Sequence, residues 1–385
     1  MCEDHATPSD AAQPTEASRG MGRRALLRGA SATGVLAGAG LLAAAGPASA
    51  SSTGSPKRPF GPLELVLLGT EAGPPPEAYR AGISTALVVD GKTYLIDCGR
   101  ASVTQYKKAG LKYASLEAIF LTHLHADHIA DYYNYVMLSG LPSSIDKDMI
   151  AGPVKVWGPG PAGALRPAFG GAQVPTVAPA NPTPGTIDLT TKLDEAYAYS
   201  HNVFLRDNGY RDPRTLRQLT EIAVPDVGQS PLGDTAPPMK PFKVMEDDRV
   251  SVSAVLVPHG PVFPAFAFRF DTDHGSVTFS GDTRLNDNLL GLARGSDVLV
   301  HEAIADPRKI GLTGAQLDHQ LQSHVLNSEV GGVAQRSDVP HLVLSHLVDW
   351  GREINIGEWT RLARRGYDGK VTVGQDLMRL TVARR

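Results

Sequence analysis

Short apolar runs recur along most of the chain and are typical of buried β-strands. Strands are predicted at 63–68, 84–89, 93–97, 117–121, 250–257, 265–270, 276–281, 297–301 and 341–345. Helical patterns are predicted at 101–110, 130–138, 287–294 and 325–336. Both halves of the chain thus place helices among strands. This order predicts two β-sheets with helices on their outer faces, an α/β (α+β) fold arranged as a four-layer αββα sandwich.

Side chains that bind metals are concentrated where the strand at 117–121 ends. The segment LTHLHADH supplies His123, His125, Asp127 and His128. A turn at this point can direct His123 and His125 toward one ion, and Asp127 and His128 toward a second. Nitrogen and carboxylate ligands without cysteine favour zinc, with iron or manganese as alternatives. We therefore predict a dinuclear metal site rather than a solvated polar turn.

The segment HLHADH at 123–128 resembles the HxHxDH signature of the metallo-β-lactamase fold hydrolases. Three later residues each follow an apolar run and resemble the remaining ligands of that family in the same order, namely His259, Asp282 and His346. The resemblance implies two Zn²⁺ per chain. One ion would be held by His123, His125 and His259, the other by Asp127, His128 and His346, and Asp282 would bridge them.

The resemblance can be narrowed to one branch of the family. Residues 67–100 look like the opening of the branch that contains tRNase Z and the zinc-dependent arylsulfatases, and HEAI at 301–304 resembles its HEAT segment. Residues 346–378 look more like the secreted arylsulfatase-like members. The resemblance covers most of residues 63–383, apart from a poorly matched middle at about 159–240.

The resemblance also implies roles in hydrolysis by a hydroxide that bridges the metals. Asp127 would orient the nucleophile in addition to binding metal. His324 would protonate the leaving oxygen or donate a hydrogen bond to it. The alternative for His324 is an exposed histidine at a helix end. Three residues that do not bind metal themselves are expected to orient the ligands through hydrogen bonds, namely Asp97, His301 and Glu302.

The middle segment, 159–240, is expected to form a lid over the metals. It begins with Pro- and Gly-rich loop sequence, and helices are predicted at 189–205 and 215–222. Its aromatic and histidine side chains are candidate substrate contacts, with packing of the insert onto the body as the alternative; they are Tyr197, Tyr199, His201, Phe204 and Tyr210.

Charge argues against a nucleic-acid substrate. The whole chain has a formal net charge of −3, and the insert at 159–240 contains seven Lys/Arg against eight Asp/Glu. In tRNase Z the comparable region carries an arm that grips tRNA, and an arm that binds phosphates should be clearly basic. We therefore expect a small-molecule ester as substrate and no nucleic acid.

The first 50 residues differ in composition from the rest. The paired Arg23 and Arg24 precede a weakly apolar stretch and the small-residue sequence Ala48-Ser49-Ala50, a pattern that resembles a twin-arginine export signal. The stretch is too short and too weakly apolar for a transmembrane anchor. We expect a periplasmic or secreted hydrolase domain at 51–385, with no stable membrane anchor after cleavage.

These observations predict an exported, dinuclear metal hydrolase of small sulfate or phosphate esters, similar to arylsulfatases or phosphodiesterases. Hydrolysis of lactones or other acyl compounds stays open, because the same metal centre can perform it. A ribonuclease similar to tRNase Z is a less favoured alternative. A homodimer also stays open.

Overall fold

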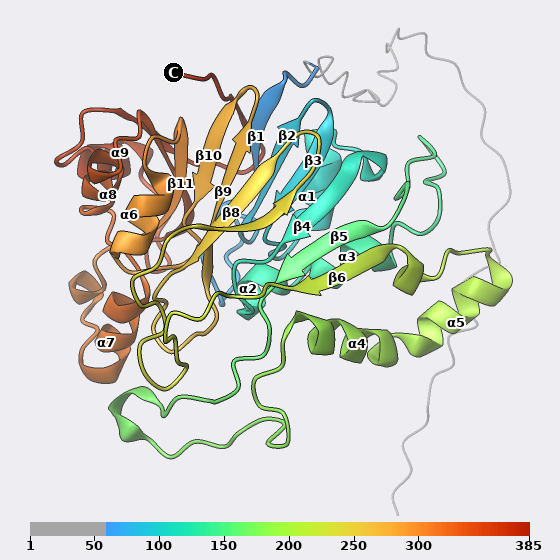
Figure 1. Ribbon diagram of the computed structural model, residues 1–385, viewed down its shortest axis with the longest axis horizontal. Helices are drawn as coiled ribbons and strands as arrows, with labels where there is room; N and C mark the ends of the chain where they lie inside the picture. Colours follow the sequence, from blue (N-terminus) through green and yellow to red (C-terminus); the bar gives the residue numbers. More distant parts are fainter. Residues whose placement is uncertain (1–58) are drawn as a thin grey trace, which may run out of the picture. The chain divides into compact units, whose positions relative to one another are not determined.

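Two seven-stranded β-sheets pack face to face in the computed structural model, which describes residues 59–385 (Figure 1). The first sheet has the order β14-β1-β2-β3-β4-β5-β6 and consists of β1 (Leu63–Gly69), β2 (Ser84–Val89), β3 (Lys92–Ile96), β4 (Leu116–Phe120), β5 (Val154–Gly158), β6 (Arg217–Glu221) and β14 (Met378–Thr381). The second has the order β13-β12-β11-β10-β9-β8-β7 and consists of β7 (Phe242–Glu246), β8 (Ser251–Leu256), β9 (Phe266–Thr272), β10 (Gly275–Phe279), β11 (Val298–Ile304), β12 (His341–Val348) and β13 (Lys370–Val373).

Helices flank both sheets. Those that follow strands of the first sheet are α1 (Ser102–Ala109), α2 (Ala126–Ile129), α3 (Tyr132–Met137), α4 (Thr186–Ala196) and α5 (Ala198–Asp207). Those of the second half are α6 (Asp287–Ala293), α7 (Gly314–Ser323), α8 (Val330–Arg336) and α9 (Ile356–Ala363). Short 3-10 helices are η1 (Tyr113–Ser115), η2 (Phe169–Gly171), η3 (Pro213–Thr215) and η4 (Pro307–Ile310).

Strand β1 illustrates why the sequences of the strands are long, mostly apolar runs. All seven of its residues are buried. Leu65 and Leu67 pack into the cluster between the sheets, whereas Val66 and Leu68 pack into the cluster outside the first sheet. A strand covered on both faces favours apolar side chains on both, so its sequence does not alternate; Glu64 is the one buried charged residue of β1.

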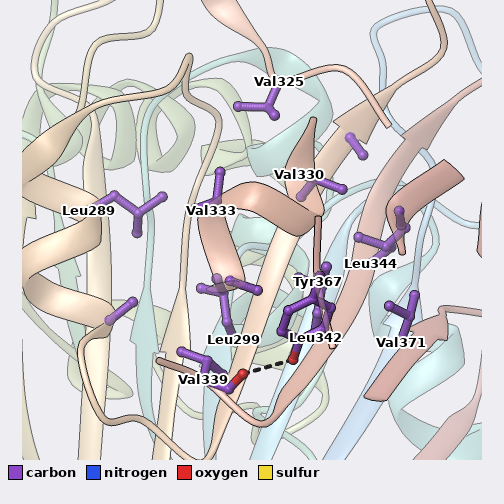
Figure 2. Close-up of a cluster of buried hydrophobic side chains, with 14 of the residues drawn as sticks. Leu289, Leu299, Val325, Val330, Val333, Val339, Leu342, Leu344, Tyr367 and Val371 are labelled. Carbon is purple, nitrogen blue, oxygen red and sulfur yellow. Dashed lines mark hydrogen bonds between the residues drawn. The ribbon is translucent and has the colours of Figure 1, made fainter. Parts of the chain in front are cut away.

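The outer face of the second sheet is covered by α6, α8 and α9, whose side chains share one buried cluster with β11 and β12. Figure 2 shows part of this cluster, with Leu289 of α6 and Val333 of α8 beside Leu299 of β11. The hydroxyl of Tyr367 donates a hydrogen bond of 2.8 Å to the carbonyl of Val339. The predicted αββα sandwich is confirmed.

Three predicted helices differ from the structure. The predicted helix at 215–222 is wrong, because Arg217–Glu221 forms β6, which pairs in parallel with β5. The predicted helix at 189–205 is two helices, α4 and α5, which are separated at Tyr197. The predicted helix at 325–336 begins only at Val330, because the preceding residues hydrogen-bond to the end of β11.

The structure adds elements that the sequence patterns did not indicate: β5, β7, β13, β14, α7 and α9. Among residues 59–385, no helix is both long and apolar enough to cross a lipid bilayer. The predicted export signal lies outside the described residues.

Candidate metal centre

The seven predicted ligands come from strand ends at one edge of the two sheets. His123 and His125 follow β4, and the short helix α2, labelled near the lower edge of the sheets in Figure 1, carries Asp127 and His128. His259 follows β8 and Asp282 follows β10. In the second sheet β8 and β10 both pair antiparallel with β9, and β10, β11 and β12 are parallel, so β8, β10 and β12 run in the same direction. Their carboxyl ends therefore lie at the same edge of the sheet, which is why residues so distant in sequence converge.

His346 reaches the cluster through a local irregularity in β12. The register between β11 and β12 shifts so that Ser345 pairs with Glu302 and Leu347 with Ala303, which leaves His346 as the extra residue. Its φ is 50°, in the left-handed region that a histidine rarely adopts. A bulge of this kind redirects a side chain, here toward the other ligands.

The ligand atoms form two groups that meet at Asp282. Those of His123, His125, His259 and Asp282 lie within 4.8 Å of one another, and those of Asp127, His128 and His346 do as well. The Oδ2 atom of Asp282 lies 3.7 Å from Nε2 of His259 and 3.9 Å from Nε2 of His123. The same oxygen lies 3.1 Å from Nε2 of His346 and 3.4 Å from Nε2 of His128. Asp282 is therefore in reach of both groups, where a bridging carboxylate would stand.

The donor set fits metal ions. Among the described residues, Nε2 of His123, Nε2 of His128 and Oδ1 of Asp282 are buried without a hydrogen-bond partner. Buried polar atoms are almost always paired, so three such atoms at one place need another partner. Imidazole nitrogens and carboxylate oxygens without a thiol are typical zinc ligands.

The imidazoles of the first group are in the protonation state that metal binding requires. Burial lowers the pKa of His123 and His259 well below the ordinary value and that of His125 to about 4. Burial alone would raise the pKa of Asp282, but the neighbouring His346 and His128 hold it well below its ordinary value. The three neutral imidazoles of the first group and the ionised Asp282 carboxylate form a ready set of electron-pair donors.

Asp97 makes the contacts of a residue that braces the ligand loop. It accepts hydrogen bonds from the Thr122 backbone N–H (2.8 Å) and from the Thr122 hydroxyl (2.9 Å). Its Oδ2 atom also lies 2.9 Å from Nδ1 of His128, which leaves Nε2 of that histidine directed at the cluster. His259 is fixed in a similar way, because its Nδ1 lies 3.0 Å from the carbonyl of Ser323. Such contacts set the ring orientation and tautomer of a ligand histidine.

Gly73 was not singled out by the sequence patterns, yet it contacts the cluster. Its backbone N–H donates a hydrogen bond of 2.9 Å to Oδ2 of Asp127. A Cβ atom at this position would lie 2.2 Å from Cβ of Asp127, so only glycine permits the approach. The available signal was a glycine directly before the proline run at 74–76.

His324 lies at the end of α7 with its ring turned toward the cluster. Its side chain is only 11% exposed, and its ring centroid is 5.1 Å from that of His259 and 5.7 Å from that of His346. The alternative prediction was therefore right about the helix end but wrong about exposure. Nδ1 of His324 lies 3.4 Å from Oε2 of Glu302, whose Oε1 accepts a hydrogen bond of 2.8 Å from the Val325 N–H. Burial lowers the pKa of His324, but the carboxylates of Glu302, Asp282 and Asp127 together raise it above its ordinary value, with Glu302 the largest of the three.

His301 lies behind the ligands. It lines a small cavity of about 30 Å³ together with Asp282 and His346. Its Nδ1 lies 2.6 Å from the carbonyl of Glu302, and its Nε2 is buried without a partner among the described residues. The three residues expected to brace the site, Asp97, His301 and Glu302, thus all lie directly beside ligands or beside His324.

The aromatic side chains of the insert mainly attach it to α3. Tyr197 stacks on Tyr133 with ring centroids 5.5 Å apart, and Nε2 of His201 lies 2.8 Å from the Tyr133 hydroxyl. Tyr210 donates a hydrogen bond of 2.7 Å to the carbonyl of Met137 and stacks on Phe204. Packing thus accounts for these four residues, whereas Tyr199 is 85% exposed. The insert residues beside His125 belong instead to 159–165 and 182–189.

Comparisons with known proteins find relatives over most of the chain. Residues 63–137 match the family model described as anti-Pycsar protein Apyc1. Ribonuclease Z of Mycolicibacterium paratuberculosis (strain ATCC BAA-968 / K-10) is 30% identical over 320 residues, which cover 83% of this chain and 98% of that protein. The short form of human tRNase Z has a TM-score of 0.55 at 20% identity and covers 83% of this chain and 99% of its own. A diphosphatase from the PhnP family has a TM-score of 0.51 at 17% identity, with coverage of 84% and 100%.

Proposed function

The chain belongs to the metallo-β-lactamase fold hydrolases related to ribonuclease Z, and on this premise we propose that it hydrolyses small phosphate or sulfate esters with two zinc ions. The observation that carries the proposal is the double ligand group joined by Asp282, whose Oδ2 lies within 3.9 Å of four histidine nitrogens. Iron or manganese would suit the same nitrogen and oxygen donors less well than zinc.

Two bound dications would supply a water of lowered pKa and stabilise the charge that develops on the ester oxygens. The chain's own residues would position the reactants. The Asp127 carboxylate, held by the Gly73 N–H, lies 3.3 Å from Nε2 of His346 and could also orient the attacking water through its other oxygen. His324 would donate a proton to the leaving oxygen, and Glu302 would keep His324 protonated before the reaction.

The charges of the insert favour a small substrate over RNA. Three of its seven basic side chains form ion pairs with acidic residues of the same segment: Arg217 with Asp194, Arg214 with Asp212, and Lys192 with Glu195. Such pairs are already neutralised and offer little to a polyanion. A protein that grips a nucleic-acid backbone needs several basic side chains directed at phosphates.

A ribonuclease that acts on RNA is the second candidate. The relative from Mycolicibacterium paratuberculosis is named ribonuclease Z and matches 83% of this chain, which weighs against our expectation of no nucleic-acid substrate. The same metal centre serves either reaction, because both break a phosphate ester. The distinction therefore depends on residues outside the ligand cluster.

Export is a further part of the proposal and is independent of the substrate. The paired Arg23 and Arg24, followed by Ala48-Ser49-Ala50, support a twin-arginine signal. Replacement of both arginines by lysine should leave unprocessed precursor in the cytoplasm, as detected by fractionation and immunoblotting. Export of this variant at the wild-type level would contradict the twin-arginine route.

The substrate can be tested with a panel assayed with and without a chelator. The panel contains nitrophenyl sulfate, nitrophenyl phosphate, bis-nitrophenyl phosphate, a lactone and a 3′-extended tRNA precursor. We expect turnover of a sulfate or phosphate ester that the chelator abolishes and that added zinc restores. Faster cleavage of the tRNA precursor than of every small ester would favour the ribonuclease, and turnover that resists chelation would refute the metal-dependent mechanism.

A further inference from the structure

A cavity of about 370 Å³ opens directly beside His125, one of the predicted metal ligands. Its walls come from the segment after β5, the start of α4, the segment after His259, and the residues around α2. The apolar side chains that line it include Leu124, Ile129, Leu165, Leu189, Val262 and Phe263. The insert therefore contributes to the site, but through its loops and α4 rather than through the aromatic residues of α5.

Uncharged side chains form the lining of the cavity around the predicted ligand His125. Its lining includes no Lys, Arg, Asp or Glu, and besides His125 only Thr183 adds a polar side chain. A charged group that entered this space would lose hydration without gaining a partner of opposite charge.

Two larger openings near the cluster differ from this cavity in their lining residues. A cavity of about 480 Å³ on the side of Leu347 is lined by Glu71, Arg80 and Asp349 among others. A cavity of about 540 Å³ beyond Gly260 is lined by charged residues that include Arg166 and Arg284. Of these three cavities, the one beside His125 is suited to an uncharged group.

Hydrogen bonds hold the walls of this cavity in place. The backbone N–H and the hydroxyl of Thr186 both donate to the carbonyl of Pro159, at 2.9 and 2.8 Å, which ties the segment after β5 to the first turn of α4. Glu221 of β6 accepts a hydrogen bond of 3.0 Å from the N–H of Ile187. Leu189 also packs against the core outside the first sheet, so the space is largely pre-formed.

We propose that this cavity binds the uncharged organic group of the ester while the anionic group lies at the metal cluster. The proposal rests on the proposed function and names the substrate class, which is esters with an apolar aryl or alkyl group. A nucleotide presents a sugar and further phosphates beside the scissile bond, and the cavity offers these groups no basic side chain of Lys or Arg and, besides His125, only the Thr183 hydroxyl. The cavity thus makes Leu165, Leu189 and Phe263 specificity-determining residues.

The experiment uses non-hydrolysable phosphonates and zinc-loaded protein, so its readout is binding by calorimetry and not turnover. Methylphosphonate, phenylphosphonate and 4-carboxyphenylphosphonate share the anionic group and differ in the organic group. We expect phenylphosphonate to bind about tenfold or more tightly than methylphosphonate, as for added apolar groups in a hydrophobic pocket. The carboxylate of 4-carboxyphenylphosphonate should abolish this gain in affinity over methylphosphonate.

Two matched variants locate the effect. Leu165→Lys places a charge at the cavity, and its side chain is 57% exposed, so the fold should tolerate it. Val174→Lys introduces the same charge in the same loop segment, at a residue that is 64% exposed and is not among the cavity residues. In Leu165→Lys, the affinity for phenylphosphonate relative to methylphosphonate should fall, and that for 4-carboxyphenylphosphonate should rise. Val174→Lys should change neither ratio.

The outcomes separate this inference from the proposed function. Equal affinities for phenyl- and methylphosphonate, or an equal effect of the two variants, would overturn the apolar site while leaving ester hydrolysis at the metals intact. Failure of every phosphonate to bind the zinc-loaded protein would count against the proposed function and against this inference with it.

Discussion

The ligand cluster and the insert beside it are held in place by different kinds of contact. The cluster lies at the ends of strands in the two sheets, and neighbouring residues such as Thr122 and Asp97 fix its histidines. The insert is attached by side-chain contacts between its helices α4 and α5 and helix α3, such as those of Tyr133 with Asp194 and with His201. The rigid sheets thus carry the reactive groups, while the insert shapes what can approach them.

This division predicts that substitutions in the cluster abolish the reaction, whereas those in the insert change its selectivity or its stability. The largest effect is expected for Asp282→Ala, because this carboxylate reaches both ligand groups. The loss of metal affinity and turnover should exceed the roughly 10–100-fold typical of residues that only support ligands.

Elemental analysis of the purified Asp282→Ala variant provides the check. Cys98→Ser is the matched control, since Cys98 is buried beside the site but is not among the predicted ligands. Wild-type metal content in the Asp282 variant would refute the bridging role.

His324→Ala should have the next largest effect, and the effect should depend on the leaving group. General acids typically contribute about 10²–10⁴-fold, and an alkoxide needs the proton far more than nitrophenolate does. Turnover of alkyl esters should fall by about that factor, with a smaller loss for nitrophenyl esters and unchanged metal content. An equal loss for both ester types together with loss of one metal ion would identify His324 as a ligand instead.

A smaller change is expected for Glu302→Gln. The Glu302 carboxylate raises the pKa of His324, so its removal should lower this pKa. An acid acts only while protonated, so activity is lost as pH rises through its pKa. The alkaline limb of the kcat/KM profile should therefore move to lower pH in the variant. A limb that stays in place would show that Glu302 does not set the protonation of His324.

The smallest effect is expected where the insert contacts α3. The Tyr133 hydroxyl donates a hydrogen bond to Asp194 (2.6 Å) and contacts His201 (2.8 Å), so Tyr133→Phe removes both contacts. The free energy of unfolding should fall by roughly 1–3 kcal/mol, as measured by urea denaturation. Metal content should stay at the wild-type value. Loss of metal in this variant would show that the contacts of the insert also hold the metal ligands in place.

The ligands at strand ends could be predicted because an apolar strand and the polar residue that follows it are close together in the sequence. An apolar run places a polar residue that follows it at a sheet edge, and the resemblance to the family's order of ligands singled out His259 and Asp282. The bulge that orients His346 could not be predicted, because it depends on the register between β11 and β12. The contact of Gly73 with Asp127 likewise joins residues far apart in the sequence.

The insert was harder to predict for the same physical reason. Arg217–Glu221 is only partly buried and mixes polar with apolar residues, and it becomes a strand because β5 offers it a free edge. Its intrinsic pattern resembles that of an amphipathic helix. Pairing with a neighbouring strand then decides whether such a segment forms a helix or a strand. The cavity residues gave no signal of their own, since proline- and glycine-rich sequence indicates a loop without indicating what the loop encloses.

The central claim is that two metal ions held by these seven residues perform the hydrolysis. The most direct test is titration of metal-free protein with zinc, with bound metal and ester hydrolysis followed together. The account predicts that activity reaches its maximum at about two zinc ions per chain. Full activity in the metal-free protein, or a maximum at about one ion per chain, would contradict it.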